Sequence, residues 1–336
     1  MRATGIGSFP GTEQRDQDEA LAMVLGELGG DEQGLPFLPE VPGRGAHATM
    51  VGRTLGLVGE LDADLQPSGW RLTGTSGSLP LDQRRGRSLL SQDLDGLEER
   101  ASGRTGGFKV QVAGPWTLAA TVERPRGDKV LADHGARREL AQALAVAVAD
   151  HVADVRRRLP AATELVLQVD EPALPAVLGG GVPTASGFGR HRTVHPPEAS
   201  DALRWVLEGS RDAGAVPWVH CCAADVPFDL LRGAGARGVL VDLSLLDADG
   251  HDAAAEALEA GDTVALGVVP SEEGGPAGDA ALVERVQRWI DMLGVDLDRV
   301  SGSLLVSPAC GLAGASPAWA RRAIELSRSV ARSLTG

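Results

Sequence analysis

The chain contains few aromatic residues and few basic residues, and both scarcities limit what it can bind. Aromatic residues make up 3% of its 336 residues, and Tyr is absent. A surface that stacks nucleic-acid bases needs such side chains. Acidic residues outnumber basic ones by 46 to 32, for a formal net charge of −14, so the chain also lacks a basic surface that would neutralise phosphates. We therefore expect no nucleic-acid partner.

Long apolar runs are also absent. No stretch reaches the 18 or more apolar residues of a membrane span, and the first residues have no apolar core of signal-peptide length. The sequence therefore predicts a cytoplasmic protein without a membrane partner.

Cysteine is scarce, and the three that occur are Cys221, Cys222 and Cys310. This odd, small number does not make a disulfide framework, and adjacent cysteines cannot easily bridge each other. Reduced thiols in a cytosolic protein indicate metal binding, catalysis or plain core packing.

Short apolar or β-branched runs recur eight times, each followed by Gly, Pro or a polar residue. These predicted strands are Ala3–Ser8, Leu35–Glu40, Phe108–Ala113, Leu165–Asp170, Val216–Cys221, Gly238–Leu243, Thr263–Val268 and Ser303–Ser307. Helical periodicity is found between them, at Ala46–Leu61, Ala136–Leu159, Glu198–Ala213, Ala253–Ala260, Ala281–Leu293 and Ser316–Leu334. The alternation predicts an α/β fold, a single (β/α)₈ TIM barrel over residues 1–336, with a doubly wound open sheet as the alternative.

One segment departs from this regular alternation. Pro67–Arg104 is rich in Gly, Ser and Arg and is longer than a usual loop. We interpret residues 67–104 as an insertion over the barrel mouth between strands 2 and 3, with a hairpin of Trp70–Thr75 and Ser78–Leu81.

Every cysteine lies at the C-terminal end of a predicted strand, where barrel enzymes build their active sites. Strand alternation in V-P-W-V-H-C-C-A places His220 and Cys222 on one side and Cys221 on the other, where we assign it to the core. Cys310 follows the last strand and could supply a third ligand. Imidazole and thiolate are zinc ligands, and a catalytic zinc keeps one position for substrate. Each residue alone is more often a core residue, but their convergence favours a metal that activates a thiol or, alternatively, water.

Four segments resemble, in the same order, the C-terminal catalytic barrel of cobalamin-independent methionine synthases. They are T-G-I-G-S-F-P (Thr4–Pro10), Q-V-D-E-P-A-L (Gln168–Leu174), H-C-C (His220–Cys222) and S-P-A-C-G-L (Ser307–Leu312). The resemblance runs nearly end to end and implies a zinc-bound homocysteine thiolate that accepts a methyl group to give methionine. It also implies that Ser8 holds the amino acid, and that Asp170 and Glu40 bind its ammonium group.

The chain departs from this family in three ways. The family's large N-terminal domain is absent, as in short single-barrel members, so the expected donor is a methyl-corrinoid, with a corrinoid protein as partner, or a methyl-folate. The family has a zinc-ligating Glu at the end of its sixth strand, and this chain has another residue there. An alignment without gaps from His220 places Ser244 at that position, and a small shift of the alignment places Asp242 there as a possible fourth ligand. The family's His after the seventh strand is missing, because Val268–Ser271 reads V-V-P-S.

We therefore predict a zinc-dependent thiol S-methyltransferase with homocysteine as acceptor. One rival is a related zinc barrel that alkylates another thiol, as the coenzyme M transferases do. The other rival is a non-catalytic barrel that binds zinc and a thiol amino acid as a sensor or store.

Overall fold

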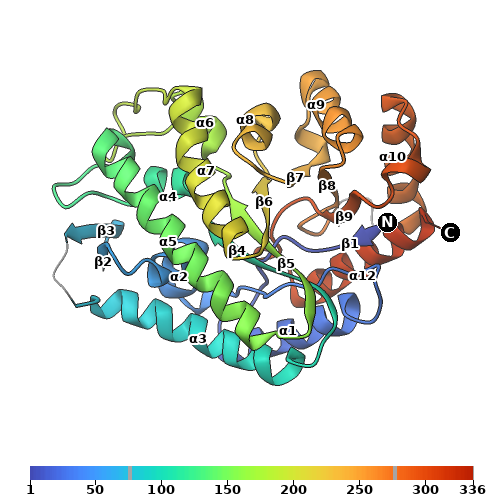
Figure 1. Ribbon diagram of the computed structural model, residues 1–336, viewed down its shortest axis with the longest axis horizontal. Helices are drawn as coiled ribbons and strands as arrows, with labels where there is room; N and C mark the ends of the chain where they lie inside the picture. Colours follow the sequence, from blue (N-terminus) through green and yellow to red (C-terminus); the bar gives the residue numbers. More distant parts are fainter. Residues whose placement is uncertain (75–77, 275–277, 336) are drawn as a thin grey trace.

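The computed structural model describes residues 1–74, 78–274 and 278–335. A parallel sheet of seven strands in the order β1-β9-β8-β7-β6-β5-β4 forms its centre (Figure 1). These strands are β1 (Arg2–Ala3), β4 (Gly106–Ala113), β5 (Ala162–Asp170), β6 (Val216–Cys221), β7 (Gly238–Asp242), β8 (Thr263–Val269) and β9 (Leu304–Pro308). The order follows the chain without the reversal that marks a doubly wound sheet, so the curled sheet is that of a TIM-like barrel.

The predicted second strand, Leu35–Glu40, does not form a continuous strand. It makes isolated parallel bridges, Ser8 to Glu40 on one side and Phe37 to Lys109 on the other. Pro36 and Pro39 interrupt the segment, and because proline has no N–H group, a regular ladder cannot form through them. The predicted eight-strand sheet is therefore wrong at this segment, which nevertheless lies between β1 and β4.

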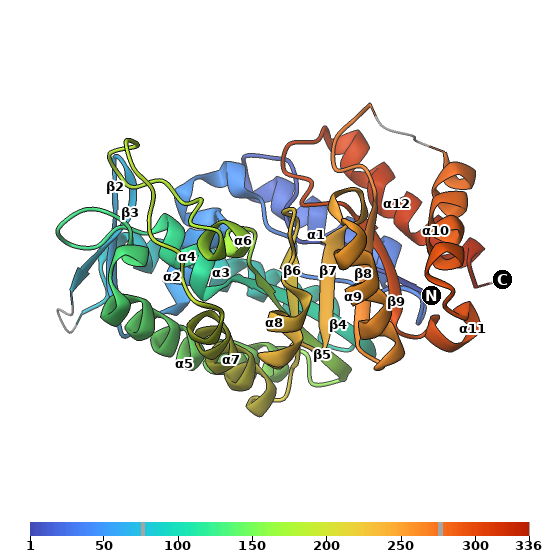
Figure 2. The same ribbon diagram turned by 90° about the horizontal axis from the view of Figure 1, so that it is seen from above.

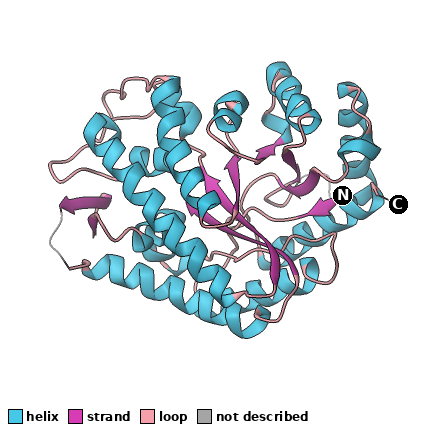
Figure 3. Cartoon of the chain, in the orientation of Figure 1, coloured by secondary structure: helices cyan, strands magenta, loops and turns pink. Residues whose placement is uncertain are grey.

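Helices surround the sheet, as Figures 2 and 3 show. They are α1 (Gln14–Leu28), α2 (Met50–Leu57), α3 (Leu81–Ala101), α4 (Pro115–Thr121), α5 (His134–Arg158), α6 (Leu174–Leu178), α7 (Pro196–Asp212), α8 (Phe228–Gly233), α9 (Ala248–Glu259), α10 (Asp279–Leu293), α11 (Leu297–Val300) and α12 (Pro317–Ser333). The predicted helices correspond to α2, α5, α7, α9, α10 and α12, whereas α1, α3 and the short helices were not predicted. In the described parts of the chain, no helix combines the length and apolar character needed to cross a bilayer.

The sheet separates two groups of buried apolar side chains. The larger group lies between the sheet and the helices. The smaller group takes one residue from each of five adjacent strands together with Ile6 and Leu35, namely Val166, Trp218, Leu240, Ala265 and Leu305. Because side chains alternate along a strand, this second group fills the inside of the curl.

The predicted insertion is built differently from expectation. The hairpin pairs β2 (Asp62–Gln66) with β3 (Gly69–Gly74), so the predicted partner Ser78–Leu81 is wrong, and Thr75 is outside the described residues. Most of the remaining segment is α3, which lies against α1, α2 and α5 in the helical layer. Its buried side chains Leu90, Leu94, Leu97 and Ala101 have helical spacing, a signal that could have revealed it. The position of the hairpin over the barrel mouth stays a prediction.

Candidate metal centre and substrate pocket

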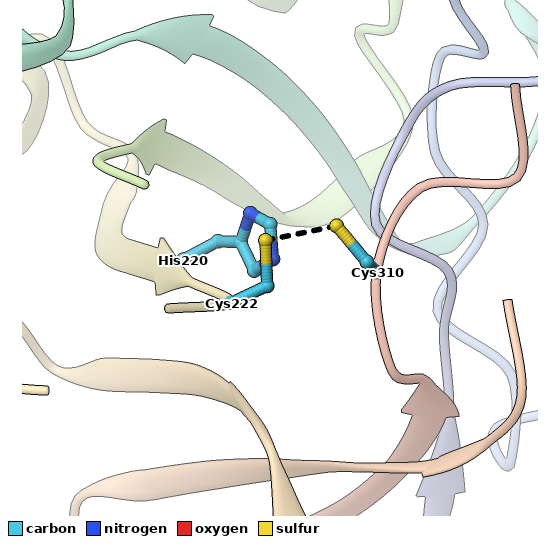
Figure 4. Close-up of side chains that lie close together, drawn as sticks. All are labelled: His220, Cys222 and Cys310. Atoms are coloured by element: carbon cyan, nitrogen blue, oxygen red, sulfur yellow. Dashed lines mark hydrogen bonds between the residues drawn. The ribbon is translucent and has the colours of Figure 1, made fainter. Parts of the chain in front are cut away.

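Three side chains meet at the C-terminal ends of β6 and β9. His220 and Cys222 project from the end of β6 toward Cys310, which follows β9 (Figure 4). The sulfur atoms of the two cysteines are 2.8 Å apart, and the potential ligand atoms of all three residues lie within 4.8 Å of one another. Cys221 is buried outside this group, as strand alternation predicts.

Two glycines allow the chain to bring Cys310 into place. A Cβ atom at Gly267 of β8 would lie 2.6 Å from Ala309 Cα, and one at Gly311 would lie 2.1 Å from Ser8 Oγ. The contact at Gly267 is with backbone and excludes a larger residue, whereas a Cβ atom at Gly311 would displace the Ser8 hydroxyl. The absence of a side chain at these positions therefore lets the segment around Cys310 pack against β8 and against the loop after β1.

Asp170 at the end of β5 sets the tautomer of His220. Its Oδ1 lies 2.9 Å from His220 Nδ1 and also accepts a 2.7 Å hydrogen bond from Gln168 Nε2. A carboxylate oxygen only accepts, so Nδ1 carries a hydrogen, and Nε2 is the nitrogen that a metal ion would bind after displacing its proton. Nε2 is buried and has no hydrogen-bond partner among the described residues. A buried, unpaired nitrogen is costly, and a metal ion would satisfy it.

The charges of the cluster also suit a cation. Contact with Cys222 lowers the pKa of the Cys310 thiol to about 4 against the effect of burial, and contact with Cys310 raises the pKa of Cys222. Burial lowers the pKa of His220, but Asp170 and Cys310 outweigh it and raise the value to about 9. The three groups therefore share protons that a divalent cation would displace. One imidazole nitrogen and two thiolate sulfurs fit zinc, with a fourth position left for another ligand.

Asp242 does not join this cluster. Its Oδ1 accepts hydrogen bonds from the backbone N and the side-chain Oγ of Ser244, at 2.8 and 2.6 Å. The carboxylate thereby caps the short helix η4 (Leu243–Leu245). Among the described residues, the group of potential metal ligands contains only the histidine and the two cysteines. The geometry therefore gives no support to Asp242 as the fourth ligand.

The cluster opens onto a pocket of about 440 Å³. Its lining residues are Ile6, Gly7, Ser8, Glu40, Pro42, Thr49, Met50, Gln111, Asp170, Pro172, His220, Cys222, Cys310 and Gly311. The structure thus brings together the predicted ligands and substrate-binding residues, except the two candidates for the fourth ligand, Asp242 and Ser244.

Two carboxylates of the pocket each have one oxygen that is not used by the protein. Both hydrogen bonds to Asp170 fall on Oδ1. Glu40 uses Oε1 alone, which accepts from Gln111 Nε2 at 3.1 Å and lies 3.4 Å from Arg53 Nε. In the described structure, no hydrogen bond falls on Asp170 Oδ2 or Glu40 Oε2. Burial raises the pKa of Glu40, although the positive charge of Arg53 opposes this shift.

Sequence reasoning missed the polar residues behind these carboxylates. Lys109 on β4 is fully buried and donates to Gln168 Oε1 at 2.6 Å and to the Ile6 carbonyl at 2.9 Å. Burial lowers the pKa of Lys109 to about 7, and the nearby Asp170 and Glu40 act in the opposite direction. Polar residues inside the apolar strands F-K-V-Q-V-A and L-V-L-Q-V-D were the signal that could have revealed them.

Fold and site together define an α/β protein with a curled, TIM-like parallel sheet, whose strand ends carry a candidate metal cluster and a pocket with two available carboxylate oxygens. A family model described as "Cobalamin-independent synthase, Catalytic domain" matches residues 107–333. The chain belongs to this family, and this membership indicates a methyltransferase of the methionine-synthase type.

Solved structures agree on the fold. A B12-independent methionine synthase from Shewanella sp. W3-18-1, in complex with selenomethionine, is similar with a TM-score of 0.63 and 14% identity over 99% of this chain and 97% of that one. A GH5_18 protein from Streptomyces cattleya, in complex with GlcNAc, has a TM-score of 0.46 and 16% identity over 99% of this chain and 80% of that one, too low to support an inference. No curated protein matches the chain.

The family description corrects one expectation from the sequence. A methyl-corrinoid donor, with a corrinoid protein as partner, is at odds with a family described as cobalamin-independent.

Proposed function

We propose that the chain is a zinc-dependent methyltransferase that transfers a methyl group to the thiol of homocysteine and releases methionine. One observation carries this proposal: a His-Cys-Cys cluster and two carboxylates with available oxygens line the same pocket of about 440 Å³. Homocysteine carries both a thiol and an ammonium group, so a single molecule can satisfy both parts of the pocket.

His220, Cys222 and Cys310 would hold the zinc ion. When bound, zinc lowers the pKa of a substrate thiol and so supplies a thiolate nucleophile at neutral pH. Asp170 keeps the His220 ring oriented through Nδ1. An oriented imidazole is a better ligand, because the partner of its second nitrogen fixes the tautomer and the ring position.

Asp170 Oδ2 and Glu40 Oε2 are proposed to accept hydrogen bonds from the substrate ammonium. A buried carboxylate that faces an ammonium group offsets the desolvation of both charges. Ser8, held beside Gly311, is proposed to bind the amino-acid end of the substrate through its hydroxyl and backbone.

The proposed donor is a methyl-folate, the remaining alternative once the corrinoid is set aside. In the transfer, the bond between the methyl carbon and the folate nitrogen breaks, the bond between carbon and sulfur forms, and the nitrogen takes up a proton. Val268–Ser271 provides no imidazole for this proton. Another group of the pocket or a water molecule must therefore deliver it.

Metal analysis combined with X-ray absorption tests this proposal directly. We expect about one zinc per chain in the wild type, strongly reduced zinc in Cys310→Ala, and an additional sulfur neighbour of zinc when homocysteine is added. Cys221→Ala is the matched control, since this buried cysteine lies outside the cluster. Absence of zinc in the wild type, or an unchanged sulfur shell with homocysteine, would remove the mechanism.

Turnover assays separate the two rivals. Tight homocysteine binding without turnover on any methyl donor would favour a sensor or storage protein. Homocysteine methylation that survives Asp170→Ala would count against ammonium recognition and favour another thiol as the natural acceptor.

A further inference from the structure

A buried network of ion pairs lies directly behind Glu40. Arg53 on α2 contacts Glu40 on one side and, through NH1, Asp93 Oδ2 on the other. Arg44, at the end of η1 (Pro42–Arg44), reaches both oxygens of Asp93 with its two terminal nitrogens, at 2.9 and 2.7 Å. The four side chains are between 0 and 6% exposed, so water screens their charges weakly.

The network is electrically balanced, and this balance depends on Asp93. Two guanidinium groups face two carboxylates, one of which is Glu40 at the pocket wall. Asp93 binds Arg44 with both of its oxygens and also binds Arg53. Arg53 also binds Asp93, and its closest approach to Glu40 is 3.4 Å, from Nε to Oε1, with no hydrogen bond to Oε2 among the described residues. Glu40 Oε2 therefore stays available to a ligand.

We propose that Asp93, which does not line the pocket, sets the affinity of the pocket for the ammonium group of its substrate. This inference rests on the proposed function and adds a specificity-determining residue to it. Loss of the Asp93 charge leaves the network with an excess positive charge and leaves Arg53 with Glu40 as its carboxylate partner. Both effects oppose the binding of the substrate ammonium group at Glu40.

The opposite charge change has the opposite effect. Loss of the Arg44 charge leaves an excess negative charge in the network, and Arg53 becomes the one guanidinium partner of Asp93 within it. Glu40 then remains available and the local potential favours an ammonium group. Asp93→Asn and Arg44→Gln disturb the same ion pair, yet they shift the charge beside the pocket in opposite directions.

Isothermal titration calorimetry on the zinc-loaded chain tests the proposal with two ligands, homocysteine and 4-mercaptobutyrate, which lacks the amino group. We expect Asp93→Asn to raise the Kd of homocysteine about three- to tenfold, as estimated for one buried charge a short distance away. The Kd of 4-mercaptobutyrate should change by less than about twofold. Arg44→Gln should lower the homocysteine Kd below that of the wild type. Asp95→Asn, on the same helix and largely exposed, is the matched control and should change neither Kd.

Two results would overturn the inference. One is that Asp93→Asn weakens the binding of homocysteine and of 4-mercaptobutyrate equally, and the other is that both Asp93→Asn and Arg44→Gln weaken homocysteine binding. Either result would mean that the network only supports the fold. If Asp93→Asn does not fold, Arg44→Gln decides the question in a Glu40→Gln background, where its effect on the ratio of the two Kd values should vanish. A wild type that binds no homocysteine would instead refute the proposed function itself.

Discussion

Asp170 has two separable tasks in the site, and two substitutions distinguish them. Asp170→Asn keeps an oxygen that can accept from both His220 Nδ1 and Gln168 Nε2, the two partners that now share Oδ1. It replaces the second oxygen, however, with an NH₂ group that donates hydrogen bonds. Asp170→Ala removes both functions. We therefore expect the Asn variant to retain zinc and lose ammonium binding, and the Ala variant to lose both.

The expected magnitudes follow from the contacts. Removing one partner of a buried, hydrogen-bonded charge pair costs about 2–5 kcal/mol, so Asp170→Asn should raise the Kd of homocysteine roughly 30- to 5,000-fold. Its zinc affinity should fall by less than about tenfold, because His220 keeps its acceptor. Asp170→Ala should lower zinc affinity by about 10- to 100-fold, as is usual when the hydrogen-bond partner of a ligating histidine is lost.

Zinc affinity is measured by competition with a chromophoric chelator, and homocysteine affinity is measured by calorimetry at saturating zinc. The amine-free ligand 4-mercaptobutyrate serves as the control, since its binding should be nearly equal in the wild type and in Asp170→Asn. The reasoning is refuted if the Asn and Ala variants lose zinc equally. It is also refuted if Asp170→Asn binds homocysteine as tightly as the wild type does.

Three further predictions concern residues around the site and in the helical layer. Gly311→Ala should lower both zinc content and homocysteine affinity, because the new Cβ would lie 2.1 Å from Ser8 Oγ; unchanged metal analysis and calorimetry would contradict this. On α3, Gly86→Ala should destabilise the chain by about 1–3 kcal/mol through a 2.8 Å contact with a backbone oxygen of α2. Gly96→Ala on the same helix should stabilise it by about 0.5–1 kcal/mol, and denaturant unfolding compares the two signs. Burial lowers the pKa of His151 from 6.5 to about 4, and the charge of Arg53 acts in the same direction. Between these two pH values the unfolded chain binds a proton that the folded chain does not bind. The free energy of unfolding therefore falls as the pH drops from about 6.5 to 4. His151→Gln should remove this contribution, which is at most about 3 kcal/mol of the free energy of unfolding. Unfolding curves recorded across that pH range measure the difference.

The grouping of His220, Cys222 and Cys310 could be predicted because its geometry is largely local. Alternation along β6 is enough to place His220 and Cys222 on one side and Cys221 on the other. Cys310 required one more step, the convergence of strand ends in a barrel, which follows from the alternation of strands and helices. Ser8 and Asp170 were located through the family motifs and Glu40 through its place at the end of the predicted strand Leu35–Glu40, and the roles proposed for all three came from the resemblance.

Asp242 illustrates a limit of this reasoning. A carboxylate just after a strand can bind a metal or cap the following turn, and both uses have the same local sequence. The backbone at Ser244 turns so that its N–H group meets Asp242 Oδ1, and this capping contact is the use of the carboxylate that the structure shows. Similarly, the pairing of β2 with β3 was missed because the partner segment D-A-D-L-Q is mostly polar and has little strand propensity.

By itself, the sequence determined the alternation of strands and helices, the His-x-Cys pair and the end of the sheet at which the chemistry lies, because each depends on short-range periodicity. The tertiary structure alone decided which side chains meet across long chain separations. Arg53 and Asp93 come together because α2 and α3 pack at the close approach of Gly52 and Gly86, and Lys109 reaches Gln168 because β4 and β5 are adjacent strands. Burial then gives these pairs their strength, since charges and amides removed from water interact strongly only with the partners that the packed fold provides.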